Sequence, residues 1–166
     1  MLTLTASAAT WFLPFALPIC IWVALNDMKH MKIPNTAVLA LTVVFVVIGL
    51  FALETWSEYF WRYVHLIVVL VIGFVLNMIR AIGAGDAKFA AAMAPFVAFP
   101  DTGIFMILLA FSLIAALLLH RLARATPFVR RATPDWVSWT SKKFPMGTAL
   151  GLSLATYLAL GIANGS

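Results

Sequence analysis

The sequence predicts an all-α polytopic membrane protein, a single membrane-embedded domain over residues 1–166 with about six helices. Hydrophobic residues make up 64% of the chain and charged residues only 10%, whereas a soluble domain carries about 25% charged residues. So few polar residues cannot form a water-facing surface, and a lipid bilayer suits such a surface better. The apolar residues fall into six segments, roughly 11–25, 34–53, 63–79, 86–99, 102–122 and 145–162.

The first segment is expected to be a retained membrane helix. Residues 1–10 contain no Lys or Arg, and the small residues 6–9 come before the apolar stretch. A cleaved signal peptide has the opposite arrangement, with a basic start and small residues after the apolar stretch. The segment is shorter than the limit of about 17 residues for a spanning helix, unless it begins further back, near Leu2.

The fourth segment is shorter than the limit of about 17 residues for a spanning helix, whereas the second, third, fifth and sixth reach that limit. Residues 86–99 include Pro95 and, as a helix, would cover only about 21 Å, against about 30 Å of hydrocarbon. One end of this segment should therefore lie below the membrane surface. Gly83, Gly85 and Asp86 stand at that end. Non-helical backbone at such depth is tolerated only inside protein or beside a water-filled cavity.

The positions of the cations predict the orientation. Threading six helices places ten of the eleven basic residues on one side, which the positive-inside rule makes cytoplasmic. They are Lys29, Lys32, Arg80, Lys88, Arg121, Arg124, Arg130, Arg131, Lys142 and Lys143, while Arg62, Glu54, Glu58 and Asp101 fall on the other side. The protein is therefore expected to be a multi-pass protein of the inner (cytoplasmic) cell membrane with both termini outside. The basic excess is better explained by membrane orientation than by binding to nucleic acid.

The long cytoplasmic loop between the fifth and sixth segments has a local signal of its own. Thr133 is expected to cap a short helix that Pro134 opens. Trp136 and Trp139, together with nearby lysines, suit an amphipathic piece that lies on the membrane surface. A role in docking a substrate is the alternative.

Two of the six acidic residues are candidates for chemistry. Asp27 closes the first helix and Asp86 opens the fourth, so both belong to the cytoplasmic side. A carboxyl pair that shares one proton can activate water and protonate a leaving group. Cys20 is the only cysteine, so an intramolecular disulfide and a cysteine-cluster zinc site are excluded. No metal or cofactor is expected. A structural explanation stays open for each acid, since an Asp at a helix start is often a cap and the glycines can form a tight turn.

Three motifs resemble those of the type IV prepilin peptidase family, and they occur in the family's order along nearly the whole chain. Residues 83–88 match its GxGDxK motif, Asp27 followed by residues 33–35 matches its first aspartate and Ile-Pro-Asn helix start, and residues 144–147 are similar to its Pro-x-Gly opening of the last helix. The resemblance implies that Asp27 and Asp86 are the catalytic pair. It further implies that the substrate-binding or motif positions are Gly83, Gly85, Lys88, Ile33, Pro34, Asn35, Pro145 and Gly147.

The resemblance also implies an activity and partners. The family consists of intramembrane aspartyl endopeptidases that remove short basic leaders from prepilin or pseudopilin precursors at the cytoplasmic face, before a hydrophobic helix. Lipid and the machinery of pilus assembly or secretion would be further partners. Long members carry a four-cysteine cytoplasmic domain and methylate the new N-terminus. This chain resembles the short form that serves tight-adherence (Flp-like) pili, and we expect no methylation.

Two other function classes agree with parts of the pattern. In a small proton- or ion-coupled transporter, Asp27 and Asp86 would relay protons across the membrane. Such proteins often have internal repeats and charges near the midplane, and neither feature stands out in this sequence. In a non-catalytic assembly subunit of a secretion or pilus machine, loss of either aspartate would leave leader cleavage unchanged.

Overall fold

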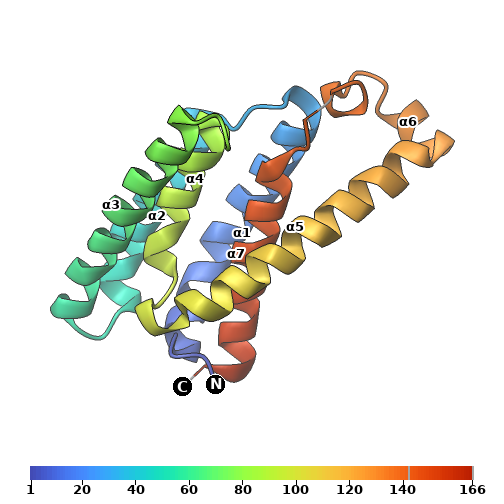
Figure 1. Ribbon diagram of the computed structural model, residues 1–166. Helices are drawn as coiled ribbons and strands as arrows, with labels where there is room; N and C mark the ends of the chain where they lie inside the picture. Colours follow the sequence, from blue (N-terminus) through green and yellow to red (C-terminus); the bar gives the residue numbers. More distant parts are fainter. Residues whose placement is uncertain (142, 166) are drawn as a thin grey trace.

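The computed structural model describes residues 1–141 and 143–165, and it is helical throughout its regular elements (Figure 1). The α-helices are α1 (Ala6–His30), α2 (Asn35–Ala52), α3 (Trp56–Met78), α4 (Ala84–Met93), α5 (Thr102–Ala125), α6 (Pro127–Ala132) and α7 (Met146–Asn164). Three short 3₁₀ helices are η1 (Ala94–Phe96), η2 (Phe99–Asp101) and η3 (Val137–Trp139). By length and composition, α1, α2, α3, α5 and α7 can each cross a membrane. The predicted all-α polytopic membrane fold is confirmed.

The helices α1 and α7 form the centre of the bundle and pack closely along their length. Glycines of α7 allow this approach. A Cβ on Gly151 would lie 2.8 Å from the carbonyl oxygen of Cys20, and one on Gly161 would lie 2.9 Å from the Cβ of Ala9. Small residues at such spacing commonly let membrane helices pack backbone to backbone. The α1–α7 pair is therefore a close-packed base for the side chains it carries.

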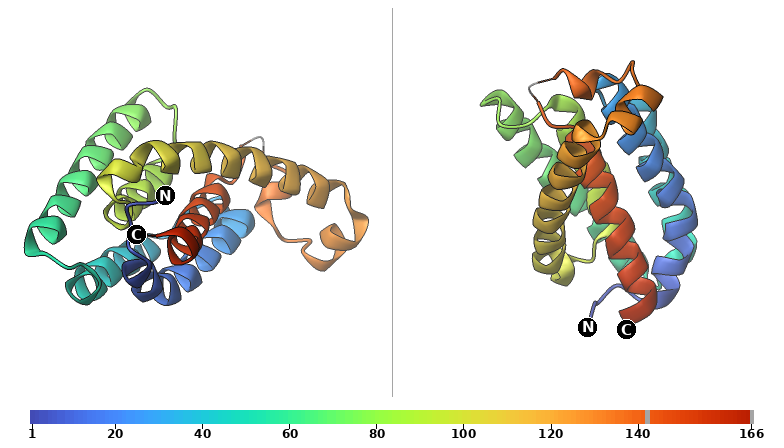
Figure 2. Two further views of the ribbon diagram at one scale, coloured as in Figure 1. Left: turned by 90° about the horizontal axis from the view of Figure 1, so that it is seen from below. Right: turned by 90° about the vertical axis from the view of Figure 1, so that its right-hand side faces the viewer.

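The remaining helices add to this pair in order. Helix α2 packs on α1, α3 packs on α4, and α5 packs on α7. Seen from below, α3 and α5 diverge with α4 between them (Figure 2). An aromatic cluster fills the junction of α1, α2 and η1, with the ring of Phe96 5.0 Å from that of Phe12 and 5.5 Å from that of Phe45. This packing holds the far end of the short α4–η1 segment inside the bundle.

Helix α4 is shorter than any other segment predicted to lie in the membrane, as its sequence indicates. It stops at Met93, two residues before Pro95, and the chain continues as η1. Proline has no N–H to donate and its ring obstructs the preceding turn, which explains the stop. The guanidinium of Arg62 donates to the carbonyl oxygen of Pro95 at 3.2 Å and pairs with Glu58 at 2.6 Å. The broken end of α4 is thus held from α3.

Two helices, α1 and α3, begin well before their apolar segments. Helix α1 extends from Ala6 to His30, because Thr5 caps its start by accepting from the N–H of Ala8. Helix α3 begins at Trp56, where the side chain of Thr55 accepts from the N–H of Glu58. Polar caps, which hydropathy does not detect, set these boundaries.

The expectation that Thr133 caps a short helix opened by Pro134 is wrong. Thr133 does not open a helix. Its hydroxyl donates to the carbonyl oxygen of Val129 at the end of α6. Trp139 is buried, stacks on His120 of α5 with ring centroids 5.4 Å apart, and donates to the carbonyl oxygen of Thr133. Tryptophan 139 therefore fastens the loop to the bundle instead of anchoring it in lipid. The expectation for Lys142 lies outside the described residues.

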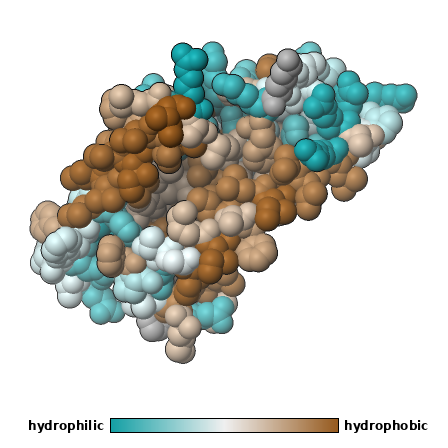
Figure 3. All heavy atoms as spheres, in the orientation of Figure 1, coloured by the Kyte–Doolittle hydropathy of each residue, from teal (hydrophilic) through white to brown (hydrophobic). Residues whose placement is uncertain are grey.

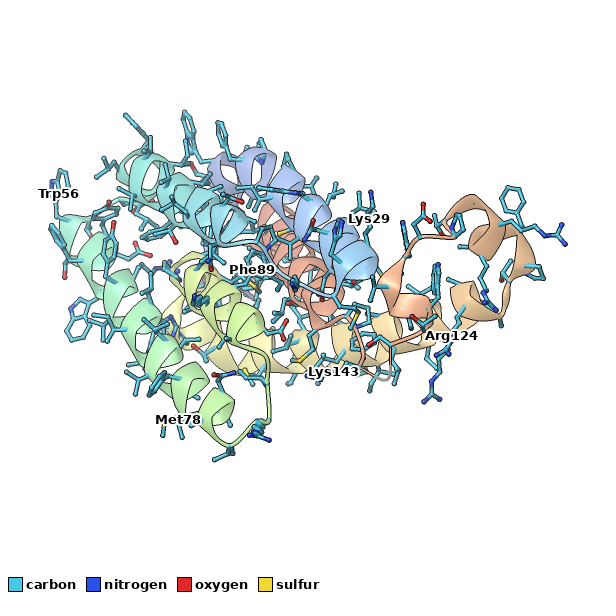
Figure 4. All side chains as sticks on the ribbon, turned by 90° about the horizontal axis from the view of Figure 1, so that it is seen from above. Lys29, Trp56, Met78, Phe89, Arg124 and Lys143 are labelled. Atoms are coloured by element: carbon cyan, nitrogen blue, oxygen red, sulfur yellow. The ribbon has the colours of Figure 1, made fainter. Side chains whose placement is uncertain are left out.

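The termini meet at one end of the bundle (Figure 1), where the N–H of Leu2 donates to the carbonyl oxygen of Asn164. A buried carboxylate organises this end. Asp101 accepts from the backbone N–H groups of Thr3 and Leu4 and from the hydroxyl of Tyr157, at 2.8 to 3.1 Å. The surface between the two ends is largely apolar (Figure 3). The opposite end carries the cation-rich loops, and Figure 4 looks down on it, with Lys29, Arg124 and Lys143 labelled.

Candidate active site

Asp27 lies in the last turn of α1, at the end of the bundle opposite the termini. Its side chain is buried, with 5% of its surface exposed. The backbone N–H of Gly147, in the first turn of α7, donates to its Oδ2 at 2.7 Å. Helix α1 ends three residues later, at His30, and Met31 adopts the left-handed conformation that closes it. Asp27 is thus held by the start of a helix that is distant in sequence.

Asp86 lies in the first turn of α4 and is partly buried. Its carboxylate folds back over Gly83, the residue that precedes the helix, so that a Cβ on Gly83 would lie 2.6 Å from Oδ2. An acid at this position faces the positive end of the helix. A side chain at position 83 would collide with the Asp86 carboxylate, so glycine is needed there.

Ile33 joins the two halves of the site. Its side chain is buried between α4 and α7. A Cβ on Gly85 would lie 3.3 Å from the Cβ of Ile33, and one on Gly147 would lie 3.1 Å from its Cδ1 and 3.0 Å from Oδ2 of Asp27. The structure therefore brings three motifs that are separated in the sequence to one place. Gly85 and Gly147 both leave room for Ile33.

The loop between α1 and α2 is tied on both sides. The side-chain amide of Asn26 donates to the carbonyl oxygen of Lys32 at 2.6 Å and lies 3.2 Å from the imidazole of His30. On the other side, Nζ of Lys88 donates to Oδ1 of Asn35 at 3.3 Å, which links α4 to the start of α2. Lys88 and Asn35 are both motif positions that the resemblance selects, and in the structure they contact each other.

The proline positions have simple structural roles. Pro34 precedes α2 in extended conformation, and Pro145 is buried and precedes α7 in the same way. A proline at the edge of a helix loses no hydrogen bond and directs the chain into the first turn. Pro145 thereby directs the N–H of Gly147 toward Asp27.

The two aspartates are close enough to influence each other. Asp86 lies in the first turn of α4, which at 10 residues is too short to span a membrane by itself. Burial, followed by the negative charge of Asp27, raises the pKa of the Asp86 carboxyl to about 6, while the backbone of Gly83 and the charge of Lys143 act in the opposite direction. Repulsion between two such carboxyls opposes a state in which both are ionised.

Asp86 also lines a cavity with a volume of about 1010 Å³. Ile82, Met146 and Leu150 surround it at this end. The site is thus open to a ligand on the Asp86 side and closed by α7 on the Asp27 side. Among the described residues, no group of three or more His, Cys, Asp or Glu side chains could hold a metal ion. The arrangement offers two carboxyls at one end of the bundle, one of them beside an accessible space, and these are group types that general acid–base chemistry uses.

Two features of this arrangement could not be predicted from the sequence. Ile33 was selected as a motif residue, but its place between Gly85 and Gly147 depends on contacts across the bundle. Lys143, in the segment before α7, acts on Asp86, and the sequence places it only among the loop cations. Its position directly before the motif at residues 144–147 was the available signal.

Comparison with known proteins gives one match. The model of the Type IV leader peptidase family matches residues 14–119, a stretch that includes Asp27, Asp86 and the motifs between them. No curated protein and no solved structure matches this chain.

Proposed function

Because the chain belongs to the type IV leader peptidase family, we propose that Asp27 and Asp86 are the catalytic pair of an aspartic leader peptidase. Membership of this family means that this membrane protein is a peptidase that acts on prepilins. The single observation that supports the assignment to these two residues is their convergence. The last turn of α1 and the first turn of α4 place a buried and a partly buried carboxyl near enough for the charge of Asp27 to raise the pKa of Asp86, and Asp86 lines a cavity.

The proposed mechanism uses the shared proton of the pair. The ionised carboxyl accepts a proton from a water molecule, which attacks the carbonyl carbon of the peptide bond after the leader. The protonated carboxyl hydrogen-bonds to the carbonyl oxygen and then supplies the proton that the leaving amine needs. Gly147 holds Asp27 through its backbone N–H. Gly83 and Gly85 keep side chains away from Asp86 and Ile33.

The substrate we propose is a Flp-like precursor, in which a short basic leader precedes a hydrophobic helix. Cleavage would occur at the cytoplasmic face of the inner membrane, with both termini of the peptidase outside. The clustering of loop cations at the aspartate end supports this orientation. Reporter fusions after Arg124 and after Glu54 test it. We expect a cytoplasmic signal from the first and an external signal from the second, and the reverse result would contradict the orientation.

Single substitutions test the catalytic pair. Asp27→Asn and Asp86→Asn should each abolish cleavage of the precursor while the protein still inserts, because an amide cannot exchange the proton that the pair shares. Asp135→Asn is the matched control, since this acid lies exposed in the loop, and it should cleave normally. Substantial cleavage by either variant of the pair would falsify the assignment and would favour a non-catalytic assembly subunit.

A further inference from the structure

A long groove follows one face of the molecule between α3 and α5, with α4 and α7 as its floor. In Figure 3 this face is largely apolar, with a recess between the two helices. Asp86 lies at one end of the groove, and Arg62, His65 and Phe99 line the other. In between, the walls are aliphatic. They include Val68, Val69, Ile72, Met106 and Leu109.

Along α3, the groove extends over most of the apolar thickness of a membrane. Along α3 it is lined from Glu58 to Leu76, which at 1.5 Å per residue is about 27 Å. A bilayer has about 30 Å of hydrocarbon. Its α3 wall therefore has nearly the length of a spanning helix, and the α5 wall, lined from Thr102 to Leu109, faces part of it.

The charged residues at the far end do not oppose an apolar ligand. Arg62 is buried, pairs with Glu58 at 2.6 Å and donates to the carbonyl oxygen of Pro95. His65 lies within 3.3 Å of the carbonyl oxygen of Val97. The polar groups of this end are thus satisfied within the protein.

A second groove provides an internal comparison. It has a volume of about 440 Å³, lies between α1, α5 and α7, and is lined along α1 only from Leu17 to Met28. That is about 17 Å, half of the hydrocarbon thickness, and neither Asp27 nor Asp86 lines it. Its length suits a lipid chain of one leaflet. The α3–α5 groove differs from it in length and in its continuity with a catalytic carboxyl.

On the basis of the proposed function, we propose that the α3–α5 groove binds the hydrophobic helix of the precursor, with the N-terminal end of that helix at Asp86. The helix would enter sideways from the bilayer and cover the apolar walls. Since Asp86 stands at one end of the groove only, a bound helix has its preceding peptide bond at the carboxyl pair. The groove thereby selects both the apolar helix and its direction.

Site-specific photocrosslinking tests this binding mode. The Asp86→Asn variant, with a photoreactive amino acid at Ile72 or Met106, is co-expressed with a full-length Flp-like precursor that stays uncleaved. Phe74 and Phe111 are matched controls, because they are exposed on the same two helices but do not line the groove. We expect crosslinks to the precursor helix that are severalfold stronger from Ile72 and Met106 than from the controls. Equal crosslinks from all four positions, or crosslinks to lipid alone, would overturn the proposal.

A bulky substitution gives an independent test in the otherwise unmodified protein. Ile72→Trp should lower the rate of precursor cleavage about tenfold, the scale expected when a fitted apolar surface is overpacked, whereas Phe74→Trp should leave the rate unchanged. If the unmodified protein cleaves and Ile72→Trp cleaves equally well, the groove assignment is wrong and the peptidase assignment stands. If the unmodified protein does not cleave the precursor, the proposed function and this inference are both wrong.

Discussion

Asp101 and Asp27 are both buried acids, but they lie at opposite ends of the bundle and have different partners. Asp101 is 2% exposed and accepts hydrogen bonds from two backbone N–H groups and one hydroxyl. Asp27 is 5% exposed and accepts one, from Gly147. A carboxylate surrounded by donors is stabilised in its charged form and is chemically inert. A carboxyl with one donor and a neighbouring acid keeps the capacity to exchange a proton.

The difference shows how the molecule separates stability from reactivity. The end with the termini uses its acid to fasten the chain, because Asp101 binds Thr3 and Leu4 of the N-terminal segment. The other end leaves two acids only partly satisfied and places one of them beside a cavity. A perturbed acid in a cleft is a candidate for a functional site.

The largest loss of stability is expected at the end of the bundle that holds the two termini. Asp101→Ala would leave the N–H groups of Thr3 and Leu4 and the hydroxyl of Tyr157 without their acceptor. We expect the free energy of unfolding to fall by about 3 kcal/mol, the scale for orphaned buried donors. Thermal unfolding in detergent measures it. Asp27→Asn should leave the unfolding temperature nearly unchanged, and a larger loss there than for Asp101→Ala would reverse the comparison.

A glycine at each end gives a matched pair of substitutions. Gly147 and Gly103 are each the second residue of a helix. A Cβ on Gly147 would crowd Asp27 and Ile33, whereas one on Gly103 would meet no atom within 4 Å. Gly147→Ala should therefore lower the cleavage rate about ten- to hundredfold by displacing a catalytic group, and Gly103→Ala should not. Equal rates for the two variants would show that the Gly147 contact does not position Asp27.

The pH dependence of cleavage should reflect the raised pKa of Asp86 beside Asp27. An exposed aspartate titrates near pH 3.9, but the pKa of Asp86 is raised to about 6 by burial and by Asp27. The singly protonated pair should therefore persist toward neutral pH, and activity should fall on both sides of its range. Lys143→Gln removes a charge that lowers this pKa, so the alkaline fall should move to higher pH. A flat profile through both titrations, with chemistry rate-limiting, would count against a shared proton.

The smallest effect is expected at the exposed edge of the site. Lys88→Met breaks the 3.3 Å hydrogen bond to Asn35. Because both side chains are exposed, we expect only about a two- to fivefold loss of cleavage rate. Asn35→Ala should cause the same loss, and the double variant should lose no more. Independent losses would mean that Lys88 acts on the substrate or lipid instead.

The sequence predicts the helices well, and it predicts that Asp27 and Asp86 lie at the same end of the bundle. Both predictions depend on local patterns. Apolar segments mark the helices, and the loop cations place the end of α1 and the start of α4 on one side. The contacts that complete each end were not predicted. Asp101 and Thr3 are 98 residues apart in the chain, and Gly147 and Asp27 are 120 apart. No local pattern indicates which distant backbone N–H will meet a given carboxylate.

Trp139 shows that a local pattern can also indicate the wrong contact partner. Its residue type and its neighbours are typical of an interfacial anchor, and so the sequence favoured lipid as its partner. In the structure His120 and Thr133 take that place. An aromatic residue in a membrane protein loop packs equally well on protein or on lipid, and only the fold decides between them.

The most direct test of the catalytic pair is a double-variant cycle at Asp27 and Asp86. Precursor cleavage is followed under single-turnover conditions for Asp27→Asn, Asp86→Asn and the double variant, each shown to be inserted and folded. If the carboxyls share one proton, each single variant is as inactive as the double variant, because residues that act as a unit are not additive. Losses that add, or substantial cleavage that survives in either single variant, would contradict the central claim.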